Sequence, residues 1–244
     1  MSYRLSLNVP RSVYRMLLFA CVMPAALPAF AAADSELIRI GSEIAQKGAS
    51  GQAPCMACHG VKGEGLATAG YPYLAAQPAE YLQQQLTHFA DGSRKQPIMQ
   101  PIAKSLDEKQ REAVSAYYAS LQPVFDRDAV SQRVQTYPKD QPGAWMANRG
   151  NENPYIPACI QCHGPGGIGV DPVFPALAGQ SENYLQTQLT AMKSGDRKGD
   201  SHELMVHLAE NLSDEQIREV SQYFAKDVLQ PVASQLTPEK GVSK

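Results

Sequence analysis

A short motif occurs twice in this chain and limits the folds that the chain can adopt. Residues 53–63 read APCMACHGVKG, and residues 157–167 read PACIQCHGPGG. In each copy two residues separate a pair of cysteines, and a histidine follows directly. The residues concerned are Cys55, Cys58 and His59 in the first copy and Cys159, Cys162 and His163 in the second. Whatever chemistry one copy supports is therefore expected at two places in the same chain.

The repetition extends beyond this motif and indicates a duplicated domain. Segments 71–86 and 174–189 read YPYLAAQPAEYLQQQL and FPALAGQSENYLQTQL. Three more pairs of similar segments follow in the same order: 90–95 with 193–198, 99–106 with 205–212, and 114–123 with 220–231. The repeat is too long for a solenoid unit, so it predicts two similar small domains. The expected division is a first domain at 34–122, a polar linker at 123–141, a second domain at 142–231 and a flexible tail at 232–244.

Apolar spacing predicts that both domains are helical. Leu82, Leu86 and Phe89 recur at helical intervals, and the second repeat has the matching set Leu185, Leu189 and Met192. A later helix is expected from near Asp107 and from near Ser213, with inner faces formed by Val114, Tyr117 and Leu121 and by Ile217, Val220 and Phe224. The sequence SDEQ at 213–216 has capping-box spacing.

Further helices are expected before each motif, ending near Lys47 and Arg149, and no segment shows a convincing strand pattern. The sequence therefore predicts an all-α fold. A domain this small buries only a modest fraction of its surface and often needs a covalent or metal-based staple.

Residues 1–33 have the pattern of an export signal. Three arginines precede a short apolar stretch, and small residues favour cleavage near Ala33. A membrane anchor is the alternative, but prolines interrupt the stretch, which is shorter than the ~20 residues of a span. Lipoprotein processing at Cys21 is a further alternative, although the apolar stretch continues past that cysteine. Cleavage leaves 19 basic and 24 acidic residues, a formal charge of −5, which argues against nucleic-acid binding. We expect a soluble protein in an oxidising, exported compartment.

Four kinds of site could use the repeated motif. Zinc is disfavoured because neither repeat alone holds four obvious ligands. A thioredoxin-like redox pair would follow a strand, and a plain disulfide would leave the repeated histidine unexplained. The remaining interpretation is covalent attachment of c-type haem, in which both thiols bond to the haem and the histidine binds iron. The sequence therefore predicts two covalent haem c groups, on Cys55 and Cys58 and on Cys159 and Cys162, with His59 and His163 as axial ligands.

An electron-carrying haem iron needs a sixth ligand, commonly methionine or histidine. Met56 lies inside the first motif, which leaves Met99 in the first domain. In the second domain Met146 precedes the motif and Met192 falls on a core face, whereas Met205 aligns with Met99. Met99 and Met205 are therefore the candidate ligands. The competing candidates are three histidines: His88, His202 and His207.

Other residues are candidates for supporting the haem groups. A carbonyl at Pro72 or Pro175 can accept the second ring N–H of an iron-bound histidine. Four basic residues could pair with haem propionates or form a solvated turn: Arg94, Lys95, Arg197 and Lys198. Tyr81 and Tyr184 could take the same role or simply pack.

Together these motifs resemble a known family. The series CxxCHG, P-x-L-A-x-Q, YLxxQL, G-x-R-K and M-x3-A-x2-L resembles class I cytochrome c domains, and its duplication over 41–230 resembles the dihaem cytochrome c4 family. The resemblance implies two cytochrome c folds with pseudo-twofold symmetry, and the ligand roles given above. The first repeat departs from the second in having Ala76 where the second has Gly179, and in lacking a serine before Asp107.

The resemblance further implies a periplasmic electron carrier rather than an enzyme. Expected partners are a quinol-oxidising complex and a haem–copper terminal oxidase, through which the protein could associate peripherally with the membrane. Two alternatives stay open. The chain could be a fixed relay subunit of a periplasmic dehydrogenase, or a dihaem peroxidase, which would need one iron with an open position.

Overall fold

The computed structural model describes residues 27–132, 139–199 and 201–230. The expected tail and residues 1–26 of the expected export signal lie outside these residues. The elements in chain order are α1 (Leu27–Lys47), α2 (Met56–His59), η1 (Ala67–Ala69), α3 (Ala79–Asp91), α4 (Met99–Ser105), α5 (Glu108–Ser120), α6 (Arg127–Ser131), α7 (Pro142–Arg149), β1 (Asn151–Glu152), β2 (Tyr155–Ile156), α8 (Ile160–His163), η2 (Pro165–Gly167), α9 (Glu182–Lys193), η3 (Ser201–Glu203), α10 (Leu204–Glu210), α11 (Asp214–Ala225) and η4 (Asp227–Leu229).

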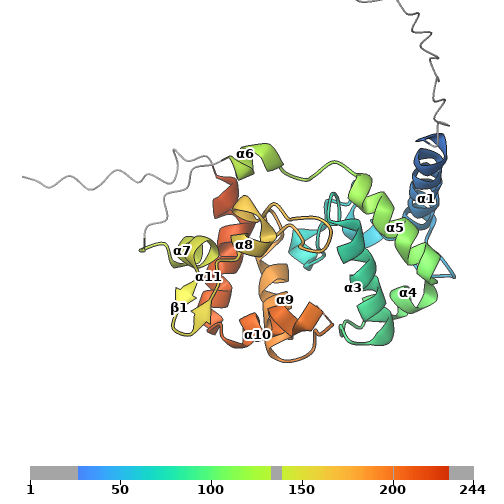
Figure 1. Ribbon diagram of the computed structural model, residues 1–244. Helices are drawn as coiled ribbons and strands as arrows, with labels where there is room; N and C mark the ends of the chain where they lie inside the picture. Colours follow the sequence, from blue (N-terminus) through green and yellow to red (C-terminus); the bar gives the residue numbers. More distant parts are fainter. Residues whose placement is uncertain (1–26, 133–138, 200, 231–244) are drawn as a thin grey trace, which may run out of the picture.

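The described chain forms two helical halves that lie side by side (Figure 1). In the first half α5 packs against α1 and α3, and α4 packs on α3. In the second half α11 packs against α7 and α9, and α10 packs on α9. The same order of contacts thus recurs, and the predicted all-α, tandem organisation is confirmed. The exception is a hairpin in the second half, in which β1 and β2 pair antiparallel.

Two equivalent glycines let the first and last long helices of each half cross closely. A Cβ on Gly41 of α1 would lie 2.0 Å from the carbonyl oxygen of Ala113 in α5. A Cβ on Gly143 of α7 would lie 2.2 Å from the carbonyl oxygen of Glu219 in α11. Both distances are far inside van der Waals contact, so only glycine permits this approach.

Each half has its own apolar core. The first contains Ile44, Leu82 and Val114, and the second contains Ile217 and Phe224 among others. The predicted inner face of α11 is confirmed. On α5 the buried tyrosine is Tyr118, whereas Tyr117, and Leu121 directly after the helix, are only partly buried against the same core.

The helix starts follow the capping pattern. Ser213 caps α11 through a capping box with Gln216, as the sequence predicts. Asp107 forms the same box with Gln110 at the start of α5. A serine before Asp107 is therefore not needed, because the aspartate itself occupies the position of Ser213.

Part of the expected linker packs on the second half. Helix α6 falls within it, and Val130 is buried in the second core. Phe125 also packs against that core. The segment 133–138 lies outside the described residues.

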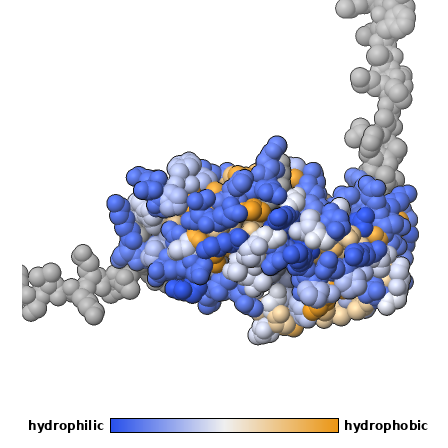
Figure 2. All heavy atoms as spheres, turned by 90° about the horizontal axis from the view of Figure 1, so that it is seen from below, coloured by the Kyte–Doolittle hydropathy of each residue, from blue (hydrophilic) through white to orange (hydrophobic). Residues whose placement is uncertain are grey.

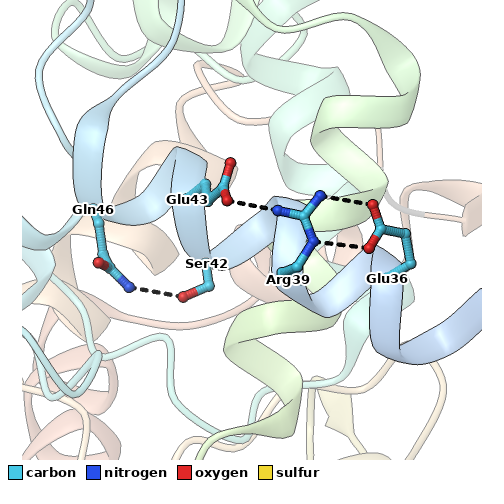
Figure 3. Close-up of polar contacts among 5 residues, drawn as sticks. All are labelled: Glu36, Arg39, Ser42, Glu43 and Gln46. Atoms are coloured by element: carbon cyan, nitrogen blue, oxygen red, sulfur yellow. Dashed lines mark hydrogen bonds and ion pairs between the residues drawn. The ribbon is translucent and has the colours of Figure 1, made fainter. Parts of the chain in front are cut away.

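The outer face of α1 carries polar contacts (Figure 3). Arg39 donates to Glu36 at 2.7 Å and to Glu43 at 2.6 Å, and Gln46 donates to Ser42. All these side chains except Ser42 are exposed, so the ion pairs contribute little to stability. Helix α1 begins before the expected cleavage point at Ala33, and cutting there retains this polar face.

Hydrophilic residues cover most of the surface drawn in Figure 2, with apolar residues in small separate groups. Of the helices described, none has the length and apolar character that a bilayer span requires.

Candidate haem sites and the interface between them

Helix α2 is one turn that ends on the first motif histidine. His59 is 7 % exposed, and its Nδ1 lies 2.9 Å from the carbonyl oxygen of Pro72. A carbonyl can only accept, so this contact assigns the proton to Nδ1 and leaves the Nε2 lone pair available to a metal.

Helix α8 repeats this arrangement in the second half. His163 is 6 % exposed, and its Nδ1 lies 2.8 Å from the carbonyl oxygen of Pro175. The contact predicted from the P-x-L segments is therefore present at both sites. Fixing the ring through its second nitrogen is the usual support for a metal-bound imidazole.

Both motif histidines lie in surroundings that favour the neutral ring. Burial lowers the pKa of His59 and of His163, and the proline carbonyls oppose this effect. The positive charge of Arg197 further lowers the pKa of His163. Neutral imidazole is the form that binds metals.

The four motif cysteines form no disulfide within the part of the chain that the structure describes, and each is only partly exposed. Cys55 packs against the first core and Cys159 against the second. Burial raises the pKa of Cys55 and raises that of Cys159 to about 12. Each half thus places the first cysteine of its motif against an apolar core, four residues before a histidine that a backbone carbonyl holds.

The candidate methionine ligands occupy equivalent helices. Met99 begins α4, where its N–H donates to Gln96 Oε1 at 2.8 Å, and Met205 is the second residue of α10. This helix start tolerates Pro101 because N–H groups in the first turn of a helix lack helical partners. Met205 packs beside Met192, which is buried as predicted.

The competing histidines do not occupy equivalent positions in the two halves. His202 and His207 are exposed, on either side of Met205. His88 lies against Gly199 of the other half, where a Cβ would come within 2.9 Å of its ring. None of the three has a counterpart at the equivalent position of the other repeat.

Two buried arginines form a cluster between the halves. Arg94 and Arg197 are 6 % and 9 % exposed and pair as an isolated antiparallel bridge. Arg94 donates to Gln85 Oε1 at 2.9 Å and to Gln188 Oε1, and Arg197 donates to the same two oxygens. The Tyr184 hydroxyl accepts from Arg94 at 3.0 Å.

The hydroxyl of Tyr81 completes the arginine cluster by accepting from Arg197 at 3.2 Å. These tyrosines therefore do more than pack. By contrast, Lys95 is exposed and pairs with Asp196 of the second half, and Lys198 is exposed. The four basic residues therefore differ in exposure: the two arginines are buried at the interface, and the two lysines are exposed.

Two further interface glutamines were not identified from the sequence. Gln77 Nε2 donates to the Ala176 carbonyl at 3.0 Å, and the Ala176 N–H donates to Gln77 Oε1 at 2.9 Å. Gln180 exchanges the equivalent pair of hydrogen bonds with the backbone of Tyr73. The available signal was the glutamine that both copies of P-x-L-A-x-Q share.

These residues fit a covalently attached haem in each half. The donor set is two unpaired thiols and one imidazole nitrogen with an open lone pair. In addition, among the described residues every hydrogen-bond partner of buried Arg94 is neutral. Buried charges in proteins are normally paired, so this guanidinium offers a place for a carboxylate such as a haem propionate.

Comparisons with known proteins agree with this fit. The family model for cytochrome c matches residues 41–122 and 150–226. A thiosulfate dehydrogenase electron acceptor of Stutzerimonas stutzeri is 41 % identical over 187 residues, which cover 76 % of this chain and 85 % of that protein.

Two solved structures are similar to this fold. Reduced recombinant cytochrome c4 from Pseudomonas stutzeri matches with a TM-score of 0.62 and 29 % identity, covering 77 % of this chain and 96 % of that chain. Thiosulfate dehydrogenase (TsdBA) from Marichromatium purpuratum matches with a TM-score of 0.68 and 36 % identity. That match covers 78 % of this chain but only 40 % of the dehydrogenase chain.

The repeated CxxCH motifs, the held histidines and these similarities lead to one assignment. The chain belongs to the cytochrome c family, as a dihaem electron carrier of the cytochrome c4 type with two covalently bound haem c groups.

Proposed function

We propose that this chain carries electrons in the periplasm from a thiosulfate dehydrogenase toward a haem–copper terminal oxidase. The observation that carries the proposal is its similarity, over most of both chains, to a protein described as a thiosulfate dehydrogenase electron acceptor. The expected export signal, cleaved near Ala33, accounts for the compartment. A quinol-oxidising complex is the other electron donor that this family resemblance suggests.

The site residues have the following proposed roles. Cys55 and Cys58 attach one haem, and Cys159 and Cys162 attach the other. His59 and Met99 bind the first iron, and His163 and Met205 bind the second. Bound haem supplies a one-electron iron couple, whose potential methionine ligation raises.

The chain's own residues prepare the sites for this role. The carbonyls of Pro72 and Pro175 hold each histidine proton on Nδ1, which directs Nε2 to the iron. With a methionine from α4 or α10 as the sixth ligand, neither iron offers a position to a substrate. We therefore propose electron transfer without catalysis, in contrast to a peroxidase.

The test is reduction by the proposed donor. Oxidised protein is mixed with thiosulfate and a catalytic amount of purified thiosulfate dehydrogenase, and haem reduction is followed by stopped-flow absorbance. We expect both haems to become reduced, and thiosulfate alone to have no effect. If dithionite reduces both haems but the enzyme and thiosulfate reduce neither, this donor is wrong.

A fixed subunit is the second candidate, and one observation favours it. The match covers only part of a longer thiosulfate dehydrogenase chain, so a similar module occurs joined to further sequence. Gel filtration with the dehydrogenase separates the two candidates. A free carrier elutes apart from the enzyme, whereas a fixed subunit elutes with it as one complex.

A further inference from the structure

A continuous hydrogen-bond chain runs from the second motif histidine to the other half. His163 Nδ1–H donates to the carbonyl of Pro175 at 2.8 Å. This carbonyl and the N–H of Ala176 belong to the same peptide group. That N–H donates to Gln77 Oε1 at 2.9 Å, and Gln77 lies in the first half, just before α3.

The first motif histidine has the mirrored chain. His59 Nδ1–H donates to the carbonyl of Pro72 at 2.9 Å, and the same peptide group includes the N–H of Tyr73. That N–H donates to Gln180 Oε1 at 3.3 Å, and Gln180 lies in the second half, just before α9. Each histidine is therefore connected, through one peptide group, to a glutamine of the opposite half.

Both glutamines are buried, and burial strengthens the electrostatic effect of their hydrogen bonds. Gln77 and Gln180 are 3 % and 4 % exposed, so water cannot readily replace their contacts. In such surroundings linked hydrogen bonds polarise one another, by roughly 10–30 % per bond. A peptide whose N–H is hydrogen-bonded has a more negative carbonyl oxygen, which binds the histidine proton more strongly. Stronger binding of that proton makes the other ring nitrogen more basic.

We infer that Gln77 and Gln180 are crossed positioning residues, each tuning the iron ligand of the opposite half through a shared peptide group. This inference rests on the histidine ligand roles proposed above. A more basic histidine favours the ferric state and lowers the haem potential. Removing Gln77 should therefore raise the potential of the second haem, and removing Gln180 that of the first.

The distances also predict unequal effects. The Ala176 N–H lies 2.9 Å from its glutamine oxygen, whereas the Tyr73 N–H lies 3.3 Å from its own. The shorter hydrogen bond polarises its peptide more. Loss of Gln77 should therefore raise the potential of the second haem by more than loss of Gln180 raises the potential of the first.

The experiment uses the full haem-loaded chain with Gln77→Leu and, separately, Gln180→Leu. Redox titration is followed by NMR of the shifted haem methyl signals, assigned to each site, so that each potential is read independently. The His Nδ1–H signals report the hydrogen bonds directly. We expect Gln77→Leu to raise the second potential and to speed exchange of the His163 proton, while the first site stays unchanged. Gln180→Leu should raise the first potential and speed exchange of the His59 proton, while the second site stays unchanged.

Two control variants separate tuning from simple packing of the interface. Lys95→Gln removes a cross-half ion pair with Asp196 but leaves both glutamines and both peptide groups in place. Gln84→Leu changes a glutamine that bonds to Glu80 within α3. Neither control should shift one potential selectively. If Gln77→Leu does not fold, Gln77→Asn shortens the amide by one methylene and should give the same crossed shift.

The possible failures are distinguishable. Equal shifts of both potentials, a shift only in the variant's own half, or no shift in a folded variant would overturn the crossed tuning. If instead the unmodified protein shows no iron-bound signals from His59 and His163, the ligand proposal itself is wrong.

Discussion

Among single residues, Ala76 occupies a strained backbone position that holds a glycine in the second repeat. Ala76 has φ of 56°, in the left-handed region, where the second repeat has Gly179 with φ of 76°. Both N–H groups donate to the last core helix, from Ala76 to Tyr118 and from Gly179 to Phe224. The backbone conformation is therefore required in both halves, and only the second has the residue that adopts it readily.

Ala76→Gly should stabilise the protein. A non-glycine residue in the left-handed region costs about 1–2 kcal/mol, and the extra chain entropy of glycine offsets part of the gain. We expect a net increase of about 0.5–1 kcal/mol in the free energy of unfolding, measured by denaturant titration of the haem-loaded chain. Gly179→Ala is the control and should destabilise. A lower stability in Ala76→Gly would contradict this explanation.

The methionine assignment makes a separate prediction. Met99→His or Met205→His should lower the potential of one haem, because the identity of the axial ligand strongly affects the iron couple. The potential of the haem in the unchanged half should change much less. Redox titration tests this, and an unchanged titration in Met205→His would point to His202, His207 or another group as the ligand.

Some residue roles could not be predicted from sequence alone. Arg94 and Lys95 are neighbours in the same motif, yet one is buried and the other is exposed. Which of two adjacent cations faces inward depends on the docking of the second half, a contact that local periodicity does not encode. The ligand-supporting prolines could be predicted because their partner lies about a dozen residues earlier in the same domain.

At the scale of elements, local signals located the long helices well. The spacing of Leu82, Leu86 and Phe89 predicted α3, and capping chemistry predicted the start of α11. The β1–β2 hairpin and α6 were not predicted. Each is short, and tertiary contacts stabilise it, as the burial of Ile156 and Val130 in the second core shows.

The helix crossings predict a sharp cost for a single methyl group. Gly41→Ala or Gly143→Ala should force α1 away from α5, or α7 away from α11, because the added Cβ overlaps a backbone carbonyl. Overpacking of this kind costs about 1–3 kcal/mol. Thermal unfolding of each variant tests this, with Ser42→Ala on the outer side of α1 as control. Equal stability of Gly41→Ala and the control would show that the helices separate without cost.

At the scale of the whole molecule, the interface joins the two halves by reciprocal contacts. Arg94 and Arg197 share two glutamine oxygens, and each half supplies one arginine and one glutamine. The sequence repeat indicated two domains, but not that both would meet through the same polar residues. Such a contact involves residues about a hundred positions apart, beyond the reach of local patterns.

The cluster predicts linked potentials. Arg94→Gln removes a positive charge that favours the reduced state, so both haem potentials should fall if the cluster faces propionates of both haems. Arg94→Lys keeps the positive charge, so both potentials should stay close to those of the unmodified protein. Lys95→Gln is the exposed control and should have little effect, because solvent screens its charge. Unchanged potentials in Arg94→Gln would mean that the cluster has only a packing role.

We propose that histidine and methionine fill the two axial positions of each iron, as suits an electron carrier. Carbon monoxide binding to the fully reduced native protein at neutral pH tests it most directly, because this ligand needs an open or displaceable iron position. We predict little or no binding at either haem, together with a low-spin ferric spectrum that shows a methionine–iron charge-transfer band. Rapid, stoichiometric binding at one haem would contradict the carrier account and favour a peroxidase-type enzyme.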